Sequence, residues 1–278
     1  MKGYKKVIGY FIKYFVLFLT SIFVLFPFLW TLITSLKPEV QIFAIPPIWL
    51  PDPVSFKNYI DAFSSGDFVQ RFGNSVIIAL GSTLLSMLIG IPASYGFARY
   101  PYKGSKTVFL LITAVRMLPV VVLGIPMYLM MRNLGLLDTK LALIIIYIPL
   151  QLTLNIWMMY GNFKKVPGEL IQASYIDGLG PLSTLVRIVV PITVPMIAVA
   201  TVFSFLASWN EFFFAMLTTS SARSMTLPVY IAGNITSQRI FWGRMTAMGI
   251  AFAIPAILFT LIAQKGLVRG LTAGAVKG

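Results

Sequence analysis

The chemistry open to this chain is limited first by the residues it lacks, because Cys and His are both absent. Without them there is no thiolate nucleophile, no disulfide and no imidazole base, and the commonest metal ligand is missing. A hydrolytic or redox enzyme would have to work with eight carboxylates alone. The sequence also contains no Gly-rich loop ending in Gly-Lys-Ser or Gly-Lys-Thr, the motif that binds nucleotide phosphates. We therefore predict no catalytic residue, no metal site, no cofactor bound by this chain and no enzymatic activity.

The polar residues that could act on a ligand lie within long apolar runs. Arg116 follows Lys106 by about ten residues, roughly 15 Å along a helix, where a charge is costly and usually faces protein or water. Pro119, Gly124 and Pro126 come next and predict a kinked or broken helix that lines a cavity. The other candidates for a ligand pathway are Gln151, Asn155, Ser204, Trp209, Asn210 and Glu211. Each of these could instead hold helices together, and Arg116 could be a buried structural ion or a snorkelling residue.

A polar break between two apolar runs, residues 164–190, is suited to receiving a mechanical push. Helix formers extend from Glu169 to Asp177 and stop at Gly178. The apolar positions of this short helix recur at helical spacing and are Leu170, Ala173 and Ile176. A helix of about nine residues is marginal alone and needs a partner surface. The alternative is an amphipathic helix that rests on the lipid interface.

The elements that position these residues are predicted membrane spans. Hydrophobic residues make up 58% of the chain and charged residues 11%, whereas a soluble domain carries about 25% charged residues. About 20 apolar residues cross the hydrocarbon core as a helix. Five uncharged runs are long enough: Tyr14–Leu36, Phe72–Ala98, Leu141–Phe163, Ile188–Asn210 and Met245–Gln264. We count Thr107–Met131 as a sixth span although it contains Arg116.

Six spans place both ends of the chain on one side of the membrane. Thirteen Lys and Arg residues against two acids fall on that side, compared with eight against five on the other. The positive-inside bias therefore predicts cytoplasmic termini and a cytoplasmic loop 164–190. The net charge of +14 is attributed to this bias, since no basic stripe is interleaved with aromatic residues as in nucleic-acid binding. The first run is too long for a signal peptide and lacks a small-residue cleavage site, so we expect a retained anchor.

The fold class predicted from these features is an all-α integral membrane protein, with residues 1–278 forming one transmembrane domain. Two of its predicted outer loops contain local sequence patterns that suggest structure or a partner. Residues 37–71 are Pro-rich and then amphipathic over Ser55–Phe63, which predicts either extended chain with a short surface helix or a plain linker. The loop Thr218–Arg244 could face a partner on the outer side.

The cytoplasmic loop also resembles a known motif. Residues Gln172–Pro191, QASYIDGLGPLSTLVRIVVP, have the spacing of the EAA loop of ABC importer permeases. Gln172-Ala173-Ser174 stands where that family usually has Glu-Ala-Ala, and Asp177-Gly178 matches its Asp-Gly. Ile188, Val190 and Pro191 close the motif. Trp209-Asn210-Glu211 and the ending Leu267–Gly278 are similar to the smaller permease subunit of maltose-type carbohydrate importers.

This resemblance implies the type I fold of ABC importer permeases, in the plasma (inner) membrane of a prokaryote. It implies four kinds of partner: a second permease, a dimer of a cytoplasmic ATPase that carries ATP and Mg, an extracytoplasmic solute-binding protein and the lipid bilayer, with no nucleic acid. ATPase closure would carry the loop helix inward and tilt the attached spans. The ATPase-coupling residues implied by the motif are Glu169, Gln172, Ala173, Ser174, Asp177, Gly178, Ile188 and Pro191.

The substrate implied by the resemblance is an oligosaccharide or a related sugar or polyol, for which an aromatic platform such as Trp209 is suitable. The motif departs from the family at Gln172 and Ser174, and Glu169 is the natural replacement for the missing acid. The rival interpretation is an ion-coupled secondary transporter, which should have paired intramembrane carboxylates, whereas only Glu211 lies at a span. A channel is a weaker alternative, because it would be expected to have a Gly-rich re-entrant filter and no such loop is visible in the sequence.

Overall fold

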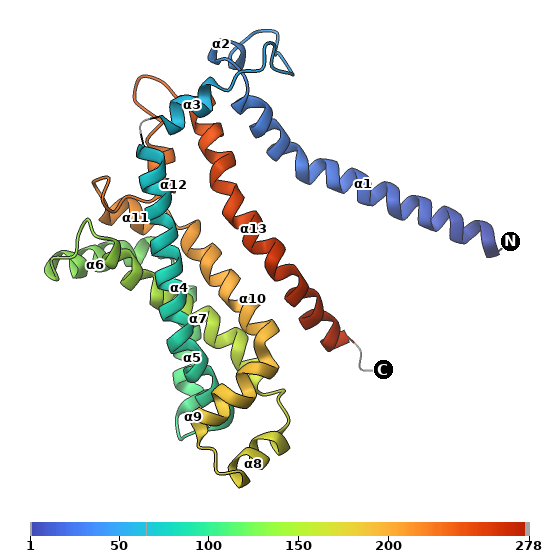
Figure 1. Ribbon diagram of the computed structural model, residues 1–278, viewed down its shortest axis with the longest axis vertical. Helices are drawn as coiled ribbons and strands as arrows, with labels where there is room; N and C mark the ends of the chain where they lie inside the picture. The colour runs from blue at the N-terminus through green and yellow to red at the C-terminus, as the bar shows by residue number, and fades with distance from the viewer. Residues whose placement is uncertain (1, 65, 276–278) are drawn as a thin grey trace. The chain divides into compact units, whose positions relative to one another are not determined.

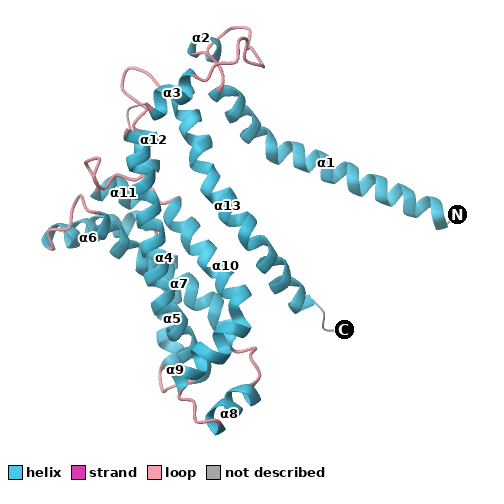
Figure 2. Cartoon of the chain, viewed as in Figure 1, coloured by secondary structure: helices cyan, strands magenta, loops and turns pink. Residues whose placement is uncertain are grey.

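The computed structural model describes residues 2–64 and 66–275, with the side chains of residues 9–64 and 66–262. Within these ranges every regular element is a helix (Figure 2). The last residues of the predicted tail motif, 276–278, lie outside the described part. The chain divides into two compact units, the first containing the chain up to Phe68 with Ile231–Ala253, and the second containing Val69–Tyr230 with the chain from Ile254.

The first unit is built on α1 (Lys2–Ser35) and the start of α13 (Trp242–Ala275), with the short helices α2 (Glu39–Ile42) and α3 (Lys57–Phe63). The loop 37–71 is more than a plain linker, because Asn58 in α3 donates to the carbonyls of Ser35 and Lys37 at 2.9 and 2.8 Å. The Lys37 ammonium in turn donates to the Ile48 carbonyl at 2.6 Å. These bonds fasten the Pro-rich segment to the end of α1 and bear out the predicted short helix.

Helix α1 itself is apolar on all sides. Its stretch Gly9–Ser35 has 27 residues, and none of its best apolar window is buried within the described chain. Phe23, for example, is 80% exposed. Such a helix must be covered by lipid or by another protein, because water would not solvate it.

The second unit contains most of the remaining helices (Figure 1). In chain order they are α4 (Asp67–Arg99), α5 (Ser105–Ala114), a 3₁₀ turn (Val115–Met117), α6 (Val120–Asn133), α7 (Lys140–Phe163), α8 (Gly168–Ile176), α9 (Pro181–Thr184), a π-helical turn (Leu185–Val189), α10 (Val190–Trp209), α11 (Phe213–Thr218) and α12 (Leu227–Ala232), which runs into the first unit. The five uncharged runs of the sequence all form helices long and apolar enough to cross a membrane.

The predicted sixth span is not one helix. Residues Ser105–Met117 and Val120–Asn133 meet at an angle of 100°, so that α6 runs crosswise to α4 (Figure 1). The break lies at Pro119, which lacks an N–H, and the residue before it, Leu118, is extended with ψ 129°. Gly124 and Pro126, expected to contribute to the break, lie instead inside α6. Gly124 is needed for packing, because a Cβ there would lie 2.9 Å from the Phe213 ring of α11.

Two hydrophobic clusters lie along α7. One surrounds its N-terminal half and joins α4, α6 and α11 through residues such as Ile78, Met131 and Phe214. The other surrounds its C-terminal half and joins α4, α8, the π-helical turn and α10 through residues such as Met159 and Leu185. Helices α4 and α7 therefore both extend through the two clusters and connect the two ends of this unit.

Candidate functional site

The loop helix predicted from the sequence is α8, and its end is fixed by a glycine. Gly178 has φ +79°, a conformation that side chains with a Cβ rarely adopt. Around it the Leu179 N–H donates to the Ser174 carbonyl at 2.9 Å and the Gly178 N–H donates to the Tyr175 carbonyl at 3.0 Å. This pair of bonds is a Schellman motif, which satisfies the last carbonyls of the helix and turns the chain toward α9.

Only one side of α8 is attached to the rest of the unit. Ile171 is buried in the cluster around the C-terminal half of α7. Ser174 is 1% exposed, and its hydroxyl is hydrogen bonded to that of Thr184 at 2.8 Å, at the end of α9. The departure from the motif at Ser174 therefore has a structural reason, since an alanine could not make this bond.

The neighbouring helices hold the same corner from the other side. The Nη2 atom of Arg99 donates to the Phe163 carbonyl at 2.7 Å and to the Val166 carbonyl. These two bonds satisfy carbonyls at and just after the C-terminus of α7. The hydroxyls of Tyr100 and Tyr175 are hydrogen bonded, which ties the chain after α4 to α8. Hydrogen bonds thus join α8 to α9 and to the residue after α4, and join α4 to the end of α7.

The outward side of α8 is uncovered. Leu170 and Ile176, predicted to form its apolar face with Ala173, are 42% and 87% exposed. The prediction that these positions share a face holds, but the face points away from this chain, while Ile171 and Ser174 point inward. The other predicted coupling residues on the outward side are Glu169, Gln172, Asp177 and Gly178; Pro191 is also exposed and Ile188 is half-buried.

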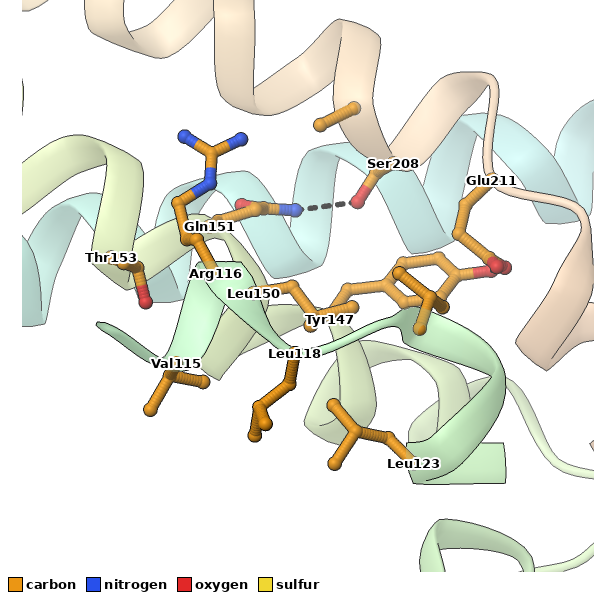
Figure 3. A pocket seen from close by; sticks show the side chains of 12 residues that line it. Val115, Arg116, Leu118, Leu123, Tyr147, Leu150, Gln151, Thr153, Ser208 and Glu211 are labelled. Carbon is orange, nitrogen blue, oxygen red and sulfur yellow. Dashed lines mark hydrogen bonds between the residues drawn. The ribbon is translucent and has the colours of Figure 1, made fainter. Parts of the chain in front are cut away.

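A cavity of about 220 Å³ gathers three of the predicted ligand-pathway residues (Figure 3). They come from different elements: Arg116 from the 3₁₀ turn after α5, Gln151 from α7 and Glu211 from the turn after α10. The break at Pro119 makes this possible, because the helical stretch ends at Met117 and Arg116 is left exposed. Tyr147 and Ser208 line the same cavity, and no pattern in the sequence had selected them.

Glu211 is engaged by its own chain. Its carboxylate accepts a hydrogen bond from the Tyr147 hydroxyl at 2.5 Å and from the backbone N–H groups of Phe214 and Ala215 at 2.8 and 3.2 Å. A carboxylate at a helix N-terminus satisfies donors that have no partner within the helix. Glu211 therefore serves to start α11 and to fix Tyr147.

Gln151, Asn155 and Ser204 belong to a buried hydrogen-bonded ladder between three helices. Each helix contributes two residues four positions apart: Ser82 and Ser86 from α4, Gln151 and Asn155 from α7, and Ser204 and Ser208 from α10. The Gln151 side-chain amide donates to Ser208 at 2.5 Å and Ser82 at 3.0 Å, and it accepts from Ser86 at 2.7 Å. Asn155 donates to Ser86 at 3.2 Å and accepts from Ser204 at 2.7 Å. This ladder holds the helices together, the alternative role considered for these residues.

The aromatic residue open to a ligand is Trp157 rather than Trp209. Trp209 is 1% exposed and packs its ring against Phe72 and Phe205. Trp157 is 59% exposed and lines a second cavity of about 340 Å³, which also includes Arg116. No pattern in the sequence separated the two tryptophans, because their difference depends on which face of each helix the neighbours cover. Asn210 is exposed, and its side chain donates to the Leu206 carbonyl at 2.9 Å.

Just before the N-terminus of α7, the Asp138 carboxylate and the serines that it binds form a group that we call the Asp138 clamp, which no sequence pattern predicted. Its carboxylate accepts from the N–H groups of Ser220 and Ser221, both at 3.0 Å, and from the hydroxyls of Ser221 and Ser224 at 2.6 and 2.5 Å. Burial alone would raise the pKa of this carboxyl, but these hydrogen bonds outweigh it and hold the pKa well below its ordinary value. The loop after α11, within the segment expected to face an outer partner, is thereby held in one conformation.

Residues 86–272 match the family described as binding-protein-dependent transport system inner membrane component. The chain is 35% identical to the sulfoquinovosyl glycerol transport system permease protein of Agrobacterium fabrum, over 91% of this chain and 89% of that protein. It is 32% identical to the trehalose/maltose transport system permease protein of Thermococcus litoralis, over 94% of each. The fold matches that of a bacterial ABC transporter involved in the import of the acidic polysaccharide alginate, with TM-score 0.78 at 20% identity, over 94% of this chain and 96% of that one.

Proposed function

The chain belongs to the family of binding-protein-dependent transport system inner membrane components, and we propose that it is the channel-forming subunit of an ATP-driven importer of a carbohydrate. It is a multi-pass inner membrane protein. A sugar is favoured as the substrate because permeases that are 32–35% identical to it are named for sulfoquinovosyl glycerol and for trehalose and maltose. Both termini and α8 lie on the cytoplasmic side, as the positive-inside bias predicts.

The observation that carries the coupling proposal is the bare outward side of α8. Ile176, at 87% exposure, is a large apolar side chain on a helix that is attached by its other side. An amphipathic helix with an uncovered apolar side fits a groove on a partner protein. We assign that groove to a cytoplasmic ATPase, one of two copies, which binds ATP and Mg. Glu169 supplies the acidic contact that the motif lacks at Gln172.

The mechanism then follows from how α8 is attached. When nucleotide closes the ATPase dimer, the groove carries α8 with it. The Ser174–Thr184 bond transmits the movement to the segment that leads into α10, and the Tyr100–Tyr175 bond transmits it to the end of α4. The spans respond as rigid bodies, so the cavity at Arg116 alternates between the two sides of the membrane. This is alternating access driven from outside the chain.

The remaining partners are a second permease, which completes the channel, and an extracytoplasmic solute-binding protein, which delivers the sugar. The family's binding-protein-dependent description supports the latter. An alginate ABC transporter of related fold has been crystallised in complex with its substrate-bound periplasmic protein, and 93% of this chain is covered by that likeness. The uncovered surface of α1 is suited to lipid or to the second permease. A secondary transporter is not favoured, because the one carboxylate on the cavity wall, Glu211, is held by Tyr147 and by α11.

The test is co-purification of the chain with its second permease and ATPase, comparing Ile176→Asp with the wild type. A buried charge in the groove should lower recovery of the ATPase tenfold or more, because apolar anchors of this size contribute about 2 kcal/mol or more. Val40→Asp is the matched control, since Val40 is 85% exposed on α2, outside the proposed contact. Equal recovery of the ATPase with both variants would contradict the proposal.

A further inference from the structure

Arg116 is the one cationic side chain on the wall of the cavity, and within the described chain it has no counter-ion. All eight carboxylate side chains of the sequence lie in the described part, and none of them pairs with it. Among the described side chains Arg116 also makes no hydrogen bond. A charge at membrane depth is costly, so an arginine left unpaired there is poised to bind something else.

The nearest candidate for a counter-ion, Glu211, is already used. Its oxygens accept from Tyr147, Phe214 and Ala215, so its charge is compensated at the start of α11. Figure 3 shows the Arg116 guanidinium and the Glu211 carboxylate at opposite ends of the cavity, with the Tyr147 ring between them. The two residues therefore do not neutralise each other, and Arg116 presents a positive charge to the cavity.

The groups around Arg116 suit a sugar. It lines both the cavity of about 220 Å³ and the neighbouring one of about 340 Å³, and Thr153 lines both as well. In the second cavity Trp157 and Thr113 join them. Thr153 and Trp157 are four residues apart and so lie on the same face of α7. An exposed indole offers a flat apolar surface to a sugar ring. The threonine hydroxyls donate to the Phe109 and Pro149 carbonyls, and their oxygens can accept hydrogen bonds from sugar hydroxyl groups.

We propose that Arg116 binds the anionic group of the transported carbohydrate, so that the substrate class is an acidic sugar bearing a carboxylate or sulfonate. This inference rests on the proposed function and adds a substrate class to it. A guanidinium donates two parallel hydrogen bonds to such a group, and the pairing is stronger in a partly desolvated cavity than in water. A neutral sugar would leave the arginine charge without compensation.

The experiment uses the assembled transporter, with both permeases and the ATPase, in lipid nanodiscs. Equilibrium dialysis compares cellobiose with the matched disaccharide whose terminal CH₂OH group is oxidised to a carboxylate. The wild type should bind the charged sugar at least about tenfold more tightly, the effect of one charge-assisted bidentate contact. Arg116→Gln should bring the ratio close to one, and Arg116→Lys should keep part of it. Arg132→Gln, which changes an exposed arginine at the end of α6 outside both cavities, should leave the ratio unchanged.

Three results would overturn the inference. The first is equal binding of the two sugars by the wild type, or no binding of the charged one at millimolar concentration. The second is an Arg116→Gln transporter that keeps the preference. The third is loss of assembly in Arg116→Gln, which would show that Arg116 pairs with a partner subunit. Failure of the proposed function is distinguishable, because the wild-type chain would then not co-purify with an ATPase before any sugar is added.

Discussion

The two ends of helix α7 differ. Its N-terminal end follows Asp138, whose carboxylate accepts four hydrogen bonds from the loop after α11. Its C-terminal end leads into α8, whose outward side chains are exposed. Both ends have a hydrophobic cluster beneath them. They differ in whether their polar and apolar side chains already have partners within the chain. The polar groups of the Asp138 clamp are satisfied within the chain, while the outward apolar and polar side chains of α8 are exposed.

One end of α7 is therefore held as a fixed point, whereas the other leads into the docking element that we propose. Substitutions at the fixed end should therefore change the stability of the chain and leave its assembly unaltered. Substitutions on the outward side of α8 should do the opposite. The residues that attach α8, Gly178 among them, should change both.

The largest effect is expected from Asp138→Ala, which breaks the fixed end. It leaves the N–H groups of Ser220 and Ser221 and two serine hydroxyls without their acceptor, and hydrogen bonds to a charged group contribute about 1.5–3 kcal/mol. We expect the free energy of unfolding to fall by about 2–3 kcal/mol, measured from the thermal midpoint in detergent. Recovery of the ATPase per folded molecule should not change; a loss of assembly without a loss of stability would contradict the comparison.

The pH dependence of the same carboxyl gives a second, smaller test. Its pKa in the folded chain lies below the unfolded value, so its ionised form stabilises the fold. That contribution is fully present above the unfolded pKa, about 4, and is lost as the pH falls through the folded pKa. The difference in thermal stability between wild type and Asp138→Asn should therefore be constant from pH 7 to 5 and shrink below about pH 4. A difference that grows on acidification would refute this assignment.

Gly178→Ala tests the attachment of α8. No atom lies within 4 Å of the added Cβ, so the cost is that of the backbone conformation at φ +79°, about 1 kcal/mol. We expect a small loss of stability together with weaker recovery of the ATPase, because the end of α8 would be shifted. Gly161→Ala is the control, because Gly161 lies inside α7 and the added Cβ meets equally open space. This variant should be slightly more stable than the wild type, since alanine favours a helix over glycine. Equal stability changes in the two variants would argue against a strained C-terminus of α8.

The smallest effect concerns the acidic contact on the outward side of α8. Glu169→Ala should weaken ATPase docking by up to about fivefold, the scale of an exposed ion pair, and Gln172→Ala should weaken it less. Neither variant should alter the stability of the chain, because both side chains are exposed. The measurement is ATPase co-purification at low and high salt. Identical behaviour of the two variants would remove Glu169 from its proposed role.

What the sequence predicts well is whatever a contiguous stretch encodes. The five uncharged runs and the helix stopped at Gly178 depend on neighbours in the chain, and the structure confirms them. The broken helix after Arg116 was also expected, because Pro119 acts on its own neighbours. Which side of each helix faces the protein interior could not be predicted from neighbouring residues alone. The inward position of Ser174 depends on Thr184. The burial of Trp209 depends on residues such as Phe72, which is distant in sequence.

The candidate site divides along the same line. Arg116 was selected because a charge in an apolar run is visible in the sequence, and the structure places it on a cavity wall. Gln151, Asn155 and Ser204 looked equally available, yet each is used up by hydrogen bonds to residues distant in sequence. The Asp138 clamp joins residues more than 80 positions apart and left no local trace.

The ladder of paired residues on α4, α7 and α10 has a mechanical consequence. The hydrogen-bonded pairs of this ladder repeat every four residues, close to one helical turn. They therefore fix the three helices in one axial register. Sliding any one of them by less than a turn would break several rungs at once in a medium that offers no replacement partners. A movement of α8 of the kind proposed above would therefore not be absorbed by sliding of these three helices past one another.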